Sequence, residues 1–443
     1  MHGVWGSRWT FILAATGSAV GLGNIWKFPY ITGENGGGAF VLMYLACILL
    51  AGVPVMMAEV LLGRRGRMSP IHTMQHMTEE QGAPKAFAGL GWMGAVAGFF
   101  ILSFYSVIAG WTLAYVVKMA MGDFSGAGAE VASAAFSDLL GSPWALLGWH
   151  TLFMAMTGFV IARGVKHGLE DSVRLMMPML FVMLLVLLGY ALTTPGFAQG
   201  FDFMFSFDTS KLNSSSIVVA LGHSFFTLSL GMGAMMAYGA YMPGKASLTK
   251  TVMTVAVLDT LVALVAGLII FPIVFSNGME PAAGPGLMFQ TLPIAFGALP
   301  AGSLIGTVFF LLVVVAAWSS AISIAEPAVA WCVEKGISRG KATFAVCALA
   351  WLLGIGTVLS FNVMGDVKFL RGTFFDNLDF LTSNLMMPLG GVAIALFVGW
   401  FMKRKDVADE VRIKNKALFN VWMFVLRFIS PLAILYIFVK GLG

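Results

Sequence analysis

Residues 17–29 have the sequence Gly17-Ser18-Ala19-Val20-Gly21-Leu22-Gly23-Asn24-Ile25-Trp26-Lys27-Phe28-Pro29. They lie inside an apolar segment, residues 8–31, that is long enough to cross a bilayer. Three glycines within seven residues weaken a helix by roughly 1 kcal/mol each, and Asn24 and Lys27 place an amide and a charge where hydrocarbon is expected. Backbone that unwinds inside a membrane needs partners other than lipid, and secondary transporters use such breaks to bind a substrate and an ion. We therefore interpret this segment as a binding site. The alternative, a glycine-rich packing face, explains the glycines but not Asn24 and Lys27.

The composition is that of a multi-pass membrane protein. Of the 443 residues, 59% are hydrophobic and only 11% are charged, whereas a soluble protein carries about 25% charged residues. The three cysteines, Cys47, Cys332 and Cys347, lie within or beside apolar segments and indicate neither a disulfide nor a metal site. The first apolar segment is longer than the hydrophobic part of a signal peptide and no cleavage site follows it, so we expect no cleavable signal peptide.

Apolar runs of about 20 residues predict eleven membrane-spanning helices and an all-α integral membrane protein. We expect them near residues 8–31, 39–62, 88–118, 144–162, 171–193, 214–241, 248–275, 299–332, 341–361, 377–402 and 417–440. Loops on one side hold most of the 26 Lys and Arg residues, including a basic run at 403–416, whereas segments 121–143 and 276–300 on the opposite side hold none. The positive-inside rule then predicts a cytoplasmic N-terminus and a C-terminus on the outer side. The basic run is interpreted as a solvated loop and not as a nucleic-acid surface.

A second interruption lies in the sixth span. Residues 225–233 read Phe225-Phe226-Thr227-Leu228-Ser229-Leu230-Gly231-Met232-Gly233, again rich in glycine and hydroxyl groups. The first and sixth spans hold corresponding positions in two sets of five, and such paired interruptions indicate an inverted repeat with its site at the repeat interface. We therefore expect a single transporter domain, residues 1–443, with repeats over about 8–193 and 214–402 and an additional helix near 417–440.

Further polar residues are expected at membrane depth. Asp259 lies about one third of the way into the seventh span, where an unpaired carboxylate costs on the order of 3 kcal/mol, so it needs a cation. Ser319 and Ser320 in the eighth span offer adjacent hydroxyls, although serines in helices often bond to the preceding turn instead. Asp376 and Asp379 lie at the start of the tenth span, where carboxylates are usually just hydrated.

The motifs at residues 17–24, 28–29, 34–40 and 225–233 together resemble the neurotransmitter:sodium symporter family, whose bacterial members have the LeuT fold. The third of these reads Glu34-Asn35-Gly36-Gly37-Gly38-Ala39-Phe40. The similarity runs over essentially the whole chain, and the eleven spans are similar to those of the shorter bacterial members, which lack a twelfth helix. The glycines on both sides of Met232 resemble bacterial transporters that accept many hydrophobic amino acids.

This resemblance implies two sodium sites. The first, Na1, would use the Ala19 carbonyl, the Asn24 amide oxygen, Thr227, Asp259 and the carboxylate of the substrate. The second, Na2, would use the carbonyls of Gly17, Val20 and Ala316 and the hydroxyls of Ser319 and Ser320. Hard oxygen ligands suit Na⁺, although the residues alone do not exclude Ca²⁺.

The resemblance also implies a substrate site. The substrate carboxylate would meet the amides of Leu22 and Gly23, at a half-helix N-terminus that favours anions, and the Tyr105 hydroxyl. Its ammonium group would face carbonyls near Ala19, Phe226, Thr227 and Ser229. Its side chain would contact Ile101, Tyr105, Phe226, Met232, Ser320, Ser323 and Ile324.

Gates are implied on both sides of this site. Lys27 and Asp379 would form the outer gate, Tyr105 and Phe226 a lid beneath it, and Trp5, Tyr241 and Glu334 the inner gate. Four residues depart from the family pattern: Lys27 and Ser319 replace the commoner Arg and Thr, His223 replaces Gln, and His2 replaces the Arg of the inner gate. Because Arg is always charged and His only partly so near pH 7, the inner gate either opens more easily or uses Arg8.

We therefore predict a sodium-coupled symporter that imports hydrophobic or aromatic L-amino acids across a bacterial inner membrane by alternating access, with two Na⁺ ions and no chloride. Asp259 would supply the negative charge that animal relatives take from Cl⁻, and Ala263, four residues on, offers chloride no ligand. Two alternatives remain: a proton-coupled symporter that uses His223 and Asp259, and a channel or amino acid sensor on the same scaffold. A sensor is expected to have lost the set formed by Asn24, Thr227 and Asp259. An enzyme is not predicted, because no intramembrane acid and base face a plausible scissile bond.

The implied pocket predicts a substrate larger than leucine, with tryptophan, phenylalanine or tyrosine among the best. Glycine on both sides of Met232 lets the backbone move aside, and the methionine side chain adapts to different shapes. Ser229 and Ser323 would leave room and one or two hydrogen bonds. Since no pocket residue is charged, lysine and glutamate should be rejected by the cost of burying an unpaired charge.

Overall fold

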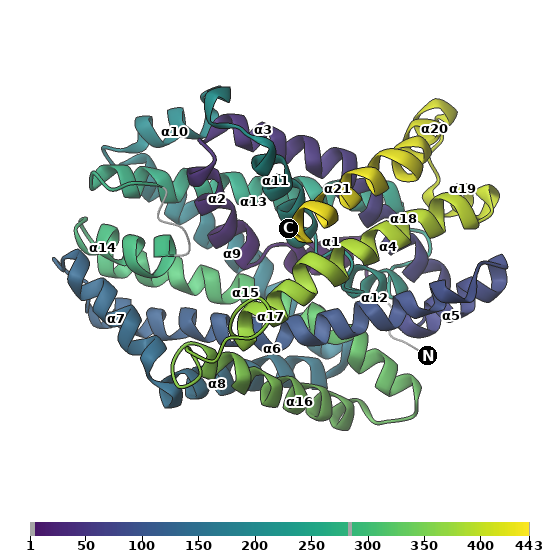
Figure 1. The fold of residues 1–443 in the computed structure, drawn as a ribbon, viewed down its shortest axis with the longest axis horizontal. Coiled ribbons are helices and arrows are strands. Elements are labelled where there is room, and N and C mark those ends of the chain that lie inside the picture. Colours follow the sequence, from purple (N-terminus) through teal and green to yellow (C-terminus); the bar gives the residue numbers. More distant parts are fainter. Residues whose placement is uncertain (1–4, 282–285, 443) are drawn as a thin grey trace.

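The computed structural model describes residues 5–281 and 286–442, which fold into a bundle of helices (Figure 1). The α-helices before the second interruption are α1 (Arg8–Ala19), α2 (Phe28–Glu34), α3 (Gly38–Cys47), α4 (Val53–Gly66), α5 (Pro70–Gln81), α6 (Gly89–Met121), α7 (Ala129–Gly141), α8 (Pro143–Ala162), α9 (Asp171–Leu192), α10 (Phe197–Phe205) and α11 (Ser214–Thr227). Those after it are α12 (Ala234–Ala240), α13 (Leu248–Ser276), α14 (Leu292–Gly297), α15 (Gly302–Glu334), α16 (Arg339–Ser360), α17 (Phe374–Asp379), α18 (Met387–Leu396), α19 (Arg404–Val411), α20 (Lys416–Phe424) and α21 (Ser430–Leu442).

Wider π-helical turns join several of these helices into longer segments. They are η1 (Gly23–Lys27), η2 (Ile48–Gly52), η4 (Val165–Glu170), η6 (Leu287–Thr291), η7 (Phe380–Met386), η8 (Phe397–Phe401) and η9 (Val425–Ile429), and short 3₁₀ turns are η3 (Lys85–Ala88) and η5 (Thr209–Lys211).

The predicted all-α membrane fold is confirmed. In the described part of the chain, nine helical segments are long and apolar enough to cross a membrane: Gly38–Gly66, Lys85–Met121, Pro143–Ala162, Val165–Leu192, Leu248–Ser276, Gly302–Glu334, Arg339–Ser360, Phe374–Phe401 and Lys416–Gly441. The first and sixth predicted spans complete the set of eleven. Each is divided into two shorter helical parts, α1 with η1–α2 and α11 with α12, because the chain unwinds between them.

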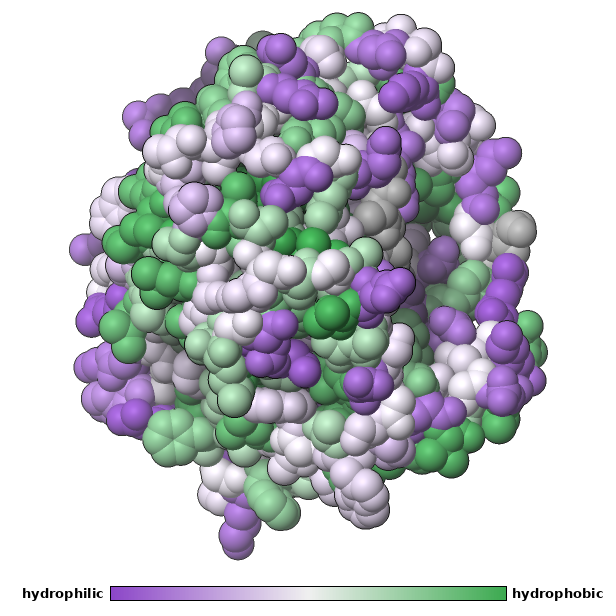
Figure 2. Space-filling view, turned by 90° about the vertical axis from the view of Figure 1, so that its left-hand side faces the viewer, coloured by the Kyte–Doolittle hydropathy of each residue, from purple (hydrophilic) through white to green (hydrophobic). Residues whose placement is uncertain are grey.

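Short helices mark the two ends of the bundle (Figure 1). The helices α5 and α19 lie at one end, together with the basic loops of the sequence; we call this the basic end. The helices α7, α10 and α14 lie at the other, which we call the α7 end. Figure 2 views the α7 end, where hydrophilic and hydrophobic residues are mixed and the surface is hollowed on one side.

Local signals in the sequence set the helix ends. The Ser69 side chain accepts the His72 N–H at the start of α5, and the Ser142 side chain caps α8 in the same way. Asn213 and Ser216 form a capping box at the start of α11. These caps lie at the starts of helices. The interruptions near residues 20–22 and 228–233 differ from them, because they lie in the interior of a span.

Helix packing brings both interruptions to the centre of the bundle. The two longest helices, α6 and α15, lie against each other, and α1 packs on α13 and α15. The helix α12 packs on α4, and α11 packs on α3 and α21. As a result the polar side chains of Asn24, Thr227, Asp259 and Ser320 are all buried, although each lies in an apolar span.

Candidate substrate and ion site

The first interruption exposes backbone carbonyls to one serine of α15. The helix α1 ends at Ala19, Val20 is extended, and helical geometry resumes at Gly23. The Ser320 hydroxyl lies 3.3, 3.2 and 3.1 Å from the carbonyl oxygens of Gly17, Ser18 and Val20. Carbonyls at a helix C-terminus carry partial negative charge, so this cluster is suited to a cation.

The predicted Na2 residues meet at this α1–α15 contact. Gly17, Val20, Ala316, Ser319 and Ser320 are all buried there. The Ser319 hydroxyl donates to the Ala316 carbonyl at 3.0 Å, which is the bond to the preceding turn that an isolated helical serine favours. Ser320 instead faces the carbonyls of α1, so the two adjacent serines have different surroundings.

The predicted Na1 residues gather around Asp259. The Asn24 amide donates to one carboxylate oxygen of Asp259 at 2.8 Å and to its backbone carbonyl at 3.0 Å. The Thr227 hydroxyl lies 3.1 Å from both carboxylate oxygens. Asp259 is fully buried, and among the described residues no basic side chain forms an ion pair with it. A buried carboxylate without a cation is costly.

The second interruption is held by three residues with left-handed backbone: Ser229 with φ 54°, Gly231 with φ 77° and Gly233 with φ 76°. Glu59 on α4 accepts the Gly231 N–H at 2.5 Å. The Ser229 hydroxyl donates to the Ser18 carbonyl at 2.9 Å. The two interruptions are therefore joined directly to each other.

A cavity of about 20 Å³ lies between the two interruptions. The predicted substrate residues that line it are Ala19, Leu22, Gly23, Ile101, Tyr105, Phe226, Thr227, Ser229, Met232, Ser320 and Ile324. Gly21 also lines it, and a Cβ atom there would lie 2.6 Å from the Ser320 hydroxyl oxygen, so a larger residue would displace this hydroxyl. The cavity has room for about one water molecule.

Ser323 does not line this cavity, which differs from the prediction. Its hydroxyl donates to the Ser320 carbonyl at 2.7 Å and accepts the Ser18 hydroxyl at 2.7 Å. The Ser229 hydroxyl likewise donates its proton to a backbone carbonyl, that of Ser18. Neither serine is left with a free donor for a substrate: Ser229 satisfies an exposed carbonyl of the first interruption, whereas Ser323 bonds to the preceding turn of the continuous helix α15.

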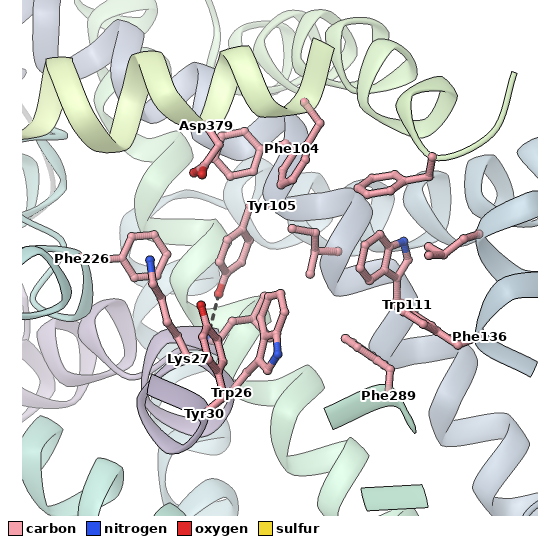
Figure 3. Close-up of a pocket in the computed structure, with 15 residues that line it drawn as sticks. Trp26, Lys27, Tyr30, Phe104, Tyr105, Trp111, Phe136, Phe226, Phe289 and Asp379 are labelled. Atoms are coloured by element: carbon pink, nitrogen blue, oxygen red, sulfur yellow. Dashed lines mark hydrogen bonds between the residues drawn. The ribbon is translucent and has the colours of Figure 1, made fainter. Parts of the chain in front are cut away.

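A larger cavity of about 400 Å³ lies on the α7 side of this site (Figure 3). Most of its walls are aromatic: Trp26, Tyr30, Phe104, Tyr105, Trp111, Phe136, Phe226, Phe289, Phe361 and Phe375. Leu22, Tyr105 and Phe226 line both cavities and therefore separate them. The Tyr105 hydroxyl accepts the Leu22 N–H at 3.4 Å.

The residues of the predicted outer gate line the larger cavity without contacting each other. The Lys27 ammonium lies 5.0 Å from the centre of the Phe226 ring, and the Asp379 carboxylate accepts the Ser383 hydroxyl at 2.9 Å. No ion pair joins Lys27 to Asp379 in the described structure. Both side chains are drawn among the lining residues of the larger cavity in Figure 3.

The basic end is closed around Trp5. The Trp5 ring packs edge-on against Tyr238 and Tyr241, with centroids 5.4 and 6.3 Å apart, and the backbone N–H of Trp5 donates to the Tyr241 carbonyl at 3.0 Å. Arg8 donates to the Thr251 hydroxyl at 3.1 Å. His2, the departure noted in the sequence, lies outside the described residues.

Glu334 of the predicted inner gate is held by α5. Its carboxylate accepts the Ser69 N–H at 2.6 Å, the Ser69 hydroxyl, and a hydrogen bond with His72 Nδ1 at 2.5 Å. Neither Ser69 nor His72 follows from the gate motif, because both lie in a loop helix far away in the sequence.

Glu326, which was not among the predicted gate residues, also lies at the basic end. It is fully buried on α15, accepts the Tyr241 hydroxyl at 2.7 Å, and receives two hydrogen bonds from Arg339 at 3.0 and 2.6 Å. The signal that selected Asp259, a carboxylate within an apolar span, also applies to Glu326 and to Glu59.

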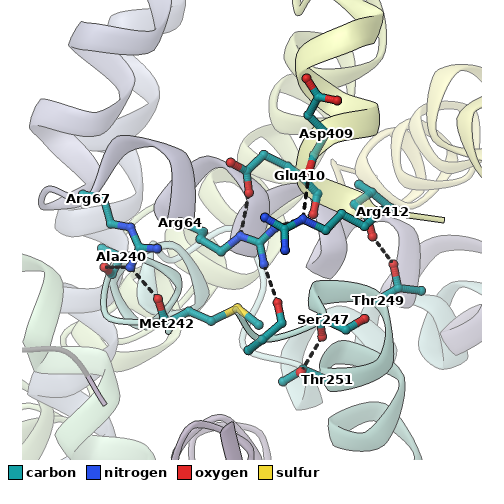
Figure 4. Close-up of polar contacts among 12 residues, drawn as sticks. Arg64, Arg67, Ala240, Met242, Ser247, Thr249, Thr251, Asp409, Glu410 and Arg412 are labelled. Carbon is teal, nitrogen blue, oxygen red and sulfur yellow. Dashed lines mark hydrogen bonds and ion pairs between the residues drawn. The ribbon is translucent and has the colours of Figure 1, made fainter. Parts of the chain in front are cut away.

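A second polar cluster at the basic end links α4, α19 and the α12–α13 loop (Figure 4). Arg64 at the end of α4 donates to the Glu410 side chain at 2.6 Å, to the Glu410 carbonyl, and to the Ala246 carbonyl at 2.8 Å. Arg67 donates to the carbonyls of Ala240 and Met242. These contacts bind α19 and the α12–α13 loop to α4, so the basic end is closed while the larger cavity lies toward the α7 end.

The site lies at the centre of a multi-pass membrane bundle, where two interrupted helices expose oxygen atoms beneath a cavity. This arrangement is that of a secondary transporter for an ion and a solute. The sequence model of the Sodium:neurotransmitter symporter family matches residues 2–125 and 124–442. The chain belongs to this family, as the sequence motifs predicted.

Relatives of known sequence and structure agree with this assignment. An uncharacterized sodium-dependent transporter of Bacillus subtilis (strain 168), YhdH, is 39% identical, covering 99% of this chain and 97% of the relative. An uncharacterized sodium-dependent transporter of Haemophilus influenzae is 33% identical, covering 99% and 98%. The crystal structure of MhsT in complex with L-phenylalanine is 43% identical in sequence, matches the full length of both chains and has a TM-score of 0.91.

Proposed function

We propose that this protein is a sodium-coupled symporter that imports bulky hydrophobic and aromatic L-amino acids with two Na⁺ ions and without chloride. The observation that carries the proposal is the Asp259 carboxylate. It is fully buried, and in the part of the chain that the structure describes its hydrogen bonds come from the neutral side chains of Asn24 and Thr227, so it needs a cation. Oxygen ligands at this site suit Na⁺.

The two ion sites follow from the two groups of oxygen atoms. For Na1 we propose the Ala19 carbonyl, Asn24, Thr227, Asp259 and the substrate carboxylate. For Na2 we propose the carbonyls of Gly17, Val20 and Ala316 and the hydroxyls of Ser319 and Ser320. The geometry around Ser320 supports Na2, because a cation there would take over the three α1 carbonyls that this hydroxyl now contacts.

The substrate would lie between the interruptions, with its carboxylate at the N–H groups of Leu22 and Gly23. The apolar walls formed by Ile101, Met232 and Ile324 suit a hydrophobic side chain, and MhsT, to which this chain is similar, was crystallised in complex with L-phenylalanine. Burial of such a side chain contributes roughly 2–3 kcal/mol.

Phe226 is the side chain that must move to admit this substrate. A cavity of about 20 Å³ is too small for an aromatic side chain. Phe226 is partly exposed and lines both cavities, so its rotation would join the small cavity to the 400 Å³ cavity. This is the movement expected of the lid formed by Tyr105 and Phe226.

The ion gradient supplies enough free energy for accumulation. Two Na⁺ ions that enter with a zwitterion contribute about 4.6 kcal/mol at 100 mV, and a tenfold Na⁺ gradient adds about 1.4 kcal/mol per ion. Together these support roughly a 10⁵-fold substrate gradient. We assign the basic end to the cytoplasm of a bacterial cell, with the C-terminus outside, and residues 8–193 and 214–402 to two inverted repeats.

Uptake into proteoliposomes tests the proposal. The purified protein should accumulate labelled L-phenylalanine or L-tryptophan when Na⁺ is outside and K⁺ inside, and should do so equally in chloride and gluconate. Accumulation driven by a proton gradient in the absence of Na⁺ would instead identify the proton-coupled alternative. Na⁺-dependent binding without any uptake would identify a sensor.

A further inference from the structure

The outer surface of the bundle carries an apolar groove that is separate from the transport site. It lies between α8 and α16, has a volume of about 580 Å³, and is lined by residues from Thr151 to Ala162 and from Gly340 to Trp351. On each helix the lining residues follow the spacing i, i+3, i+4, i+7, i+8, i+11 and thus form one continuous face. Less than half of each of these spans is buried, 39% for α8 and 44% for α16, so this face is turned toward the lipid.

The groove has the length of one acyl chain in one leaflet. Eleven residues of helix correspond to about 16 Å, which is about half of the 30 Å hydrocarbon core. The far end is closed by the Trp351 indole N–H, which donates to the Thr151 hydroxyl at 2.9 Å. The groove is deepest at Gly158, which has no side chain to fill it. The two helices lie close together there, since a Cβ atom on Gly158 would lie 3.5 Å from Cys347 Sγ.

Basic side chains surround the open end of the groove. Arg163 follows the lining residue Ala162, and Lys341 follows the lining residue Gly340. Lys166 lies on the turn after α8. All three are exposed and have no ion-pair partner among the described residues, and the Arg163 guanidinium lies 5.5 Å from the Phe159 ring centre, above the groove wall.

Most acidic residues of the same junction pair with arginine side chains. Glu326 pairs with Arg339 at 2.6 Å, and Arg339 also donates to the Ile161 carbonyl, bridging α16 to α8. Glu170 pairs with Arg174 at 2.5 Å. Asp171 is an exposed carboxylate that lies 3.6 Å from His167. The three basic side chains at the open end therefore outnumber this one carboxylate, and the open end keeps a net positive charge.

We propose that this groove is a binding site for an anionic phospholipid, with one acyl chain along α8 and α16 and the headgroup at Arg163, Lys166 and Lys341. Basic pockets between spanning helices at a membrane surface are suited to anionic headgroups, and each basic residue strengthens such binding about fivefold. A zwitterionic lipid would share the apolar contacts but not the charge.

Native mass spectrometry of the full-length protein, titrated with phosphatidylglycerol or phosphatidylcholine, tests the proposal. The wild-type protein should retain phosphatidylglycerol in preference to phosphatidylcholine. The double variant Arg163→Gln/Lys341→Gln should bind phosphatidylglycerol about 25-fold more weakly and phosphatidylcholine unchanged. The matched control is Lys403→Gln/Lys405→Gln, which removes two exposed basic residues beside α19 at the same end of the bundle and should behave like the wild type.

A second variant, Ala155→Leu/Ala348→Leu, fills the groove without a change of charge and should release both lipids. Its melting temperature in detergent should equal that of the wild type, which would show that the variant is folded. Equal retention of the two lipids by the wild type would overturn the proposal. So would equal losses in the control and Arg163→Gln/Lys341→Gln variants. A dimer that the groove-filling variant dissociates would show that a second copy, and not lipid, covers this face.

Discussion

Replacement of Asp259 by asparagine removes one charge from the centre of the site and changes its shape very little. In the structure the carboxylate accepts the Asn24 amide at 2.8 Å and the Thr227 hydroxyl at 3.1 Å, with no exposure to solvent. An asparagine side chain can keep one acceptor oxygen at this position. The variant therefore isolates the electrostatic contribution of the carboxylate.

The size of this contribution follows from the burial. Two unit charges 4 Å apart attract each other by about 4 kcal/mol at an effective dielectric constant of 20, which corresponds to about 10³-fold in affinity. The oxygen that remains in Asp259→Asn retains part of the coordination, so we expect Na⁺ affinity to fall between tenfold and about 10³-fold. The conservative variant Asp259→Glu keeps the charge but lengthens the side chain in a filled space, so it should lose less.

The assay is equilibrium binding of labelled L-phenylalanine as a function of Na⁺ concentration, in gluconate and in chloride. The matched control is Asp202→Asn, which changes an exposed carboxylate of α10 and should leave the Na⁺ dependence unchanged. A shift of less than threefold for Asp259→Asn in gluconate would refute the assignment of Asp259 to an ion site.

The chloride dependence of binding provides a second measurement on the Asp259→Asn variant. If the Asp259 carboxylate replaces a chloride ion, wild-type binding should be equal in the two anions. The variant should lose binding in gluconate and regain part of it in chloride. Because Ala263, one turn further along α13, offers no ligand, the double variant Asp259→Asn/Ala263→Ser should show the stronger chloride dependence. Wild-type binding that collapses in gluconate would contradict this reasoning.

Three further substitutions have definite expected outcomes. Met232→Phe fills the small cavity and should shift the substrate range toward small aliphatic amino acids in competition binding; alanine or glycine displacing label better than tryptophan from the wild type would contradict the pocket. Gly231→Ala should abolish binding and cost about 1–3 kcal/mol, measured as a lower melting temperature, because φ is 77° there and a Cβ atom would lie 2.4 Å from the Met387 carbonyl oxygen. Glu326→Gln leaves the partly buried Arg339 without its charged partner and should destabilise the protein by about 1–3 kcal/mol, whereas a melting temperature equal to that of the wild type would show that the pair contributes nothing.

The sequence was sufficient for those parts of the site that depend on residue type at a fixed position in a span. Asn24, Thr227 and Asp259 come from three different spans and meet in the structure as the motifs predicted. The reason is physical: each is a polar group in an apolar segment, and burial leaves it few partners except the others. Glu59 and Glu326 are also carboxylates within apolar spans, so the same signal in the sequence predicts that they are buried and paired.

Other features depend on packing and could not be read from residue type. The hydroxyl proton of Ser229 binds the Ser18 carbonyl, which is decided by how the two interruptions lie against each other. The separation of Lys27 from Asp379 likewise depends on the position of whole helices. A residue pattern gives the members of a gate, but whether they touch depends on which of two conformations the helices adopt.

The position of Asp259 also explains why substrate and ion should bind together. The substrate carboxylate, at the N–H groups of Leu22 and Gly23, would lie close to the Asp259 carboxylate, because Asn24 follows these residues and contacts Asp259 directly. Two carboxylates that close repel each other in a dry site unless a cation lies between them. Each carboxylate thus makes the cation bind more tightly, and the cation makes each carboxylate less costly to bury. The coupling must be reciprocal, so Na⁺ should raise substrate affinity by the same factor by which substrate raises Na⁺ affinity, typically about 5–150-fold. The proposed site would bind neither partner well alone, which would keep the ion gradient from dissipating without transport of the amino acid.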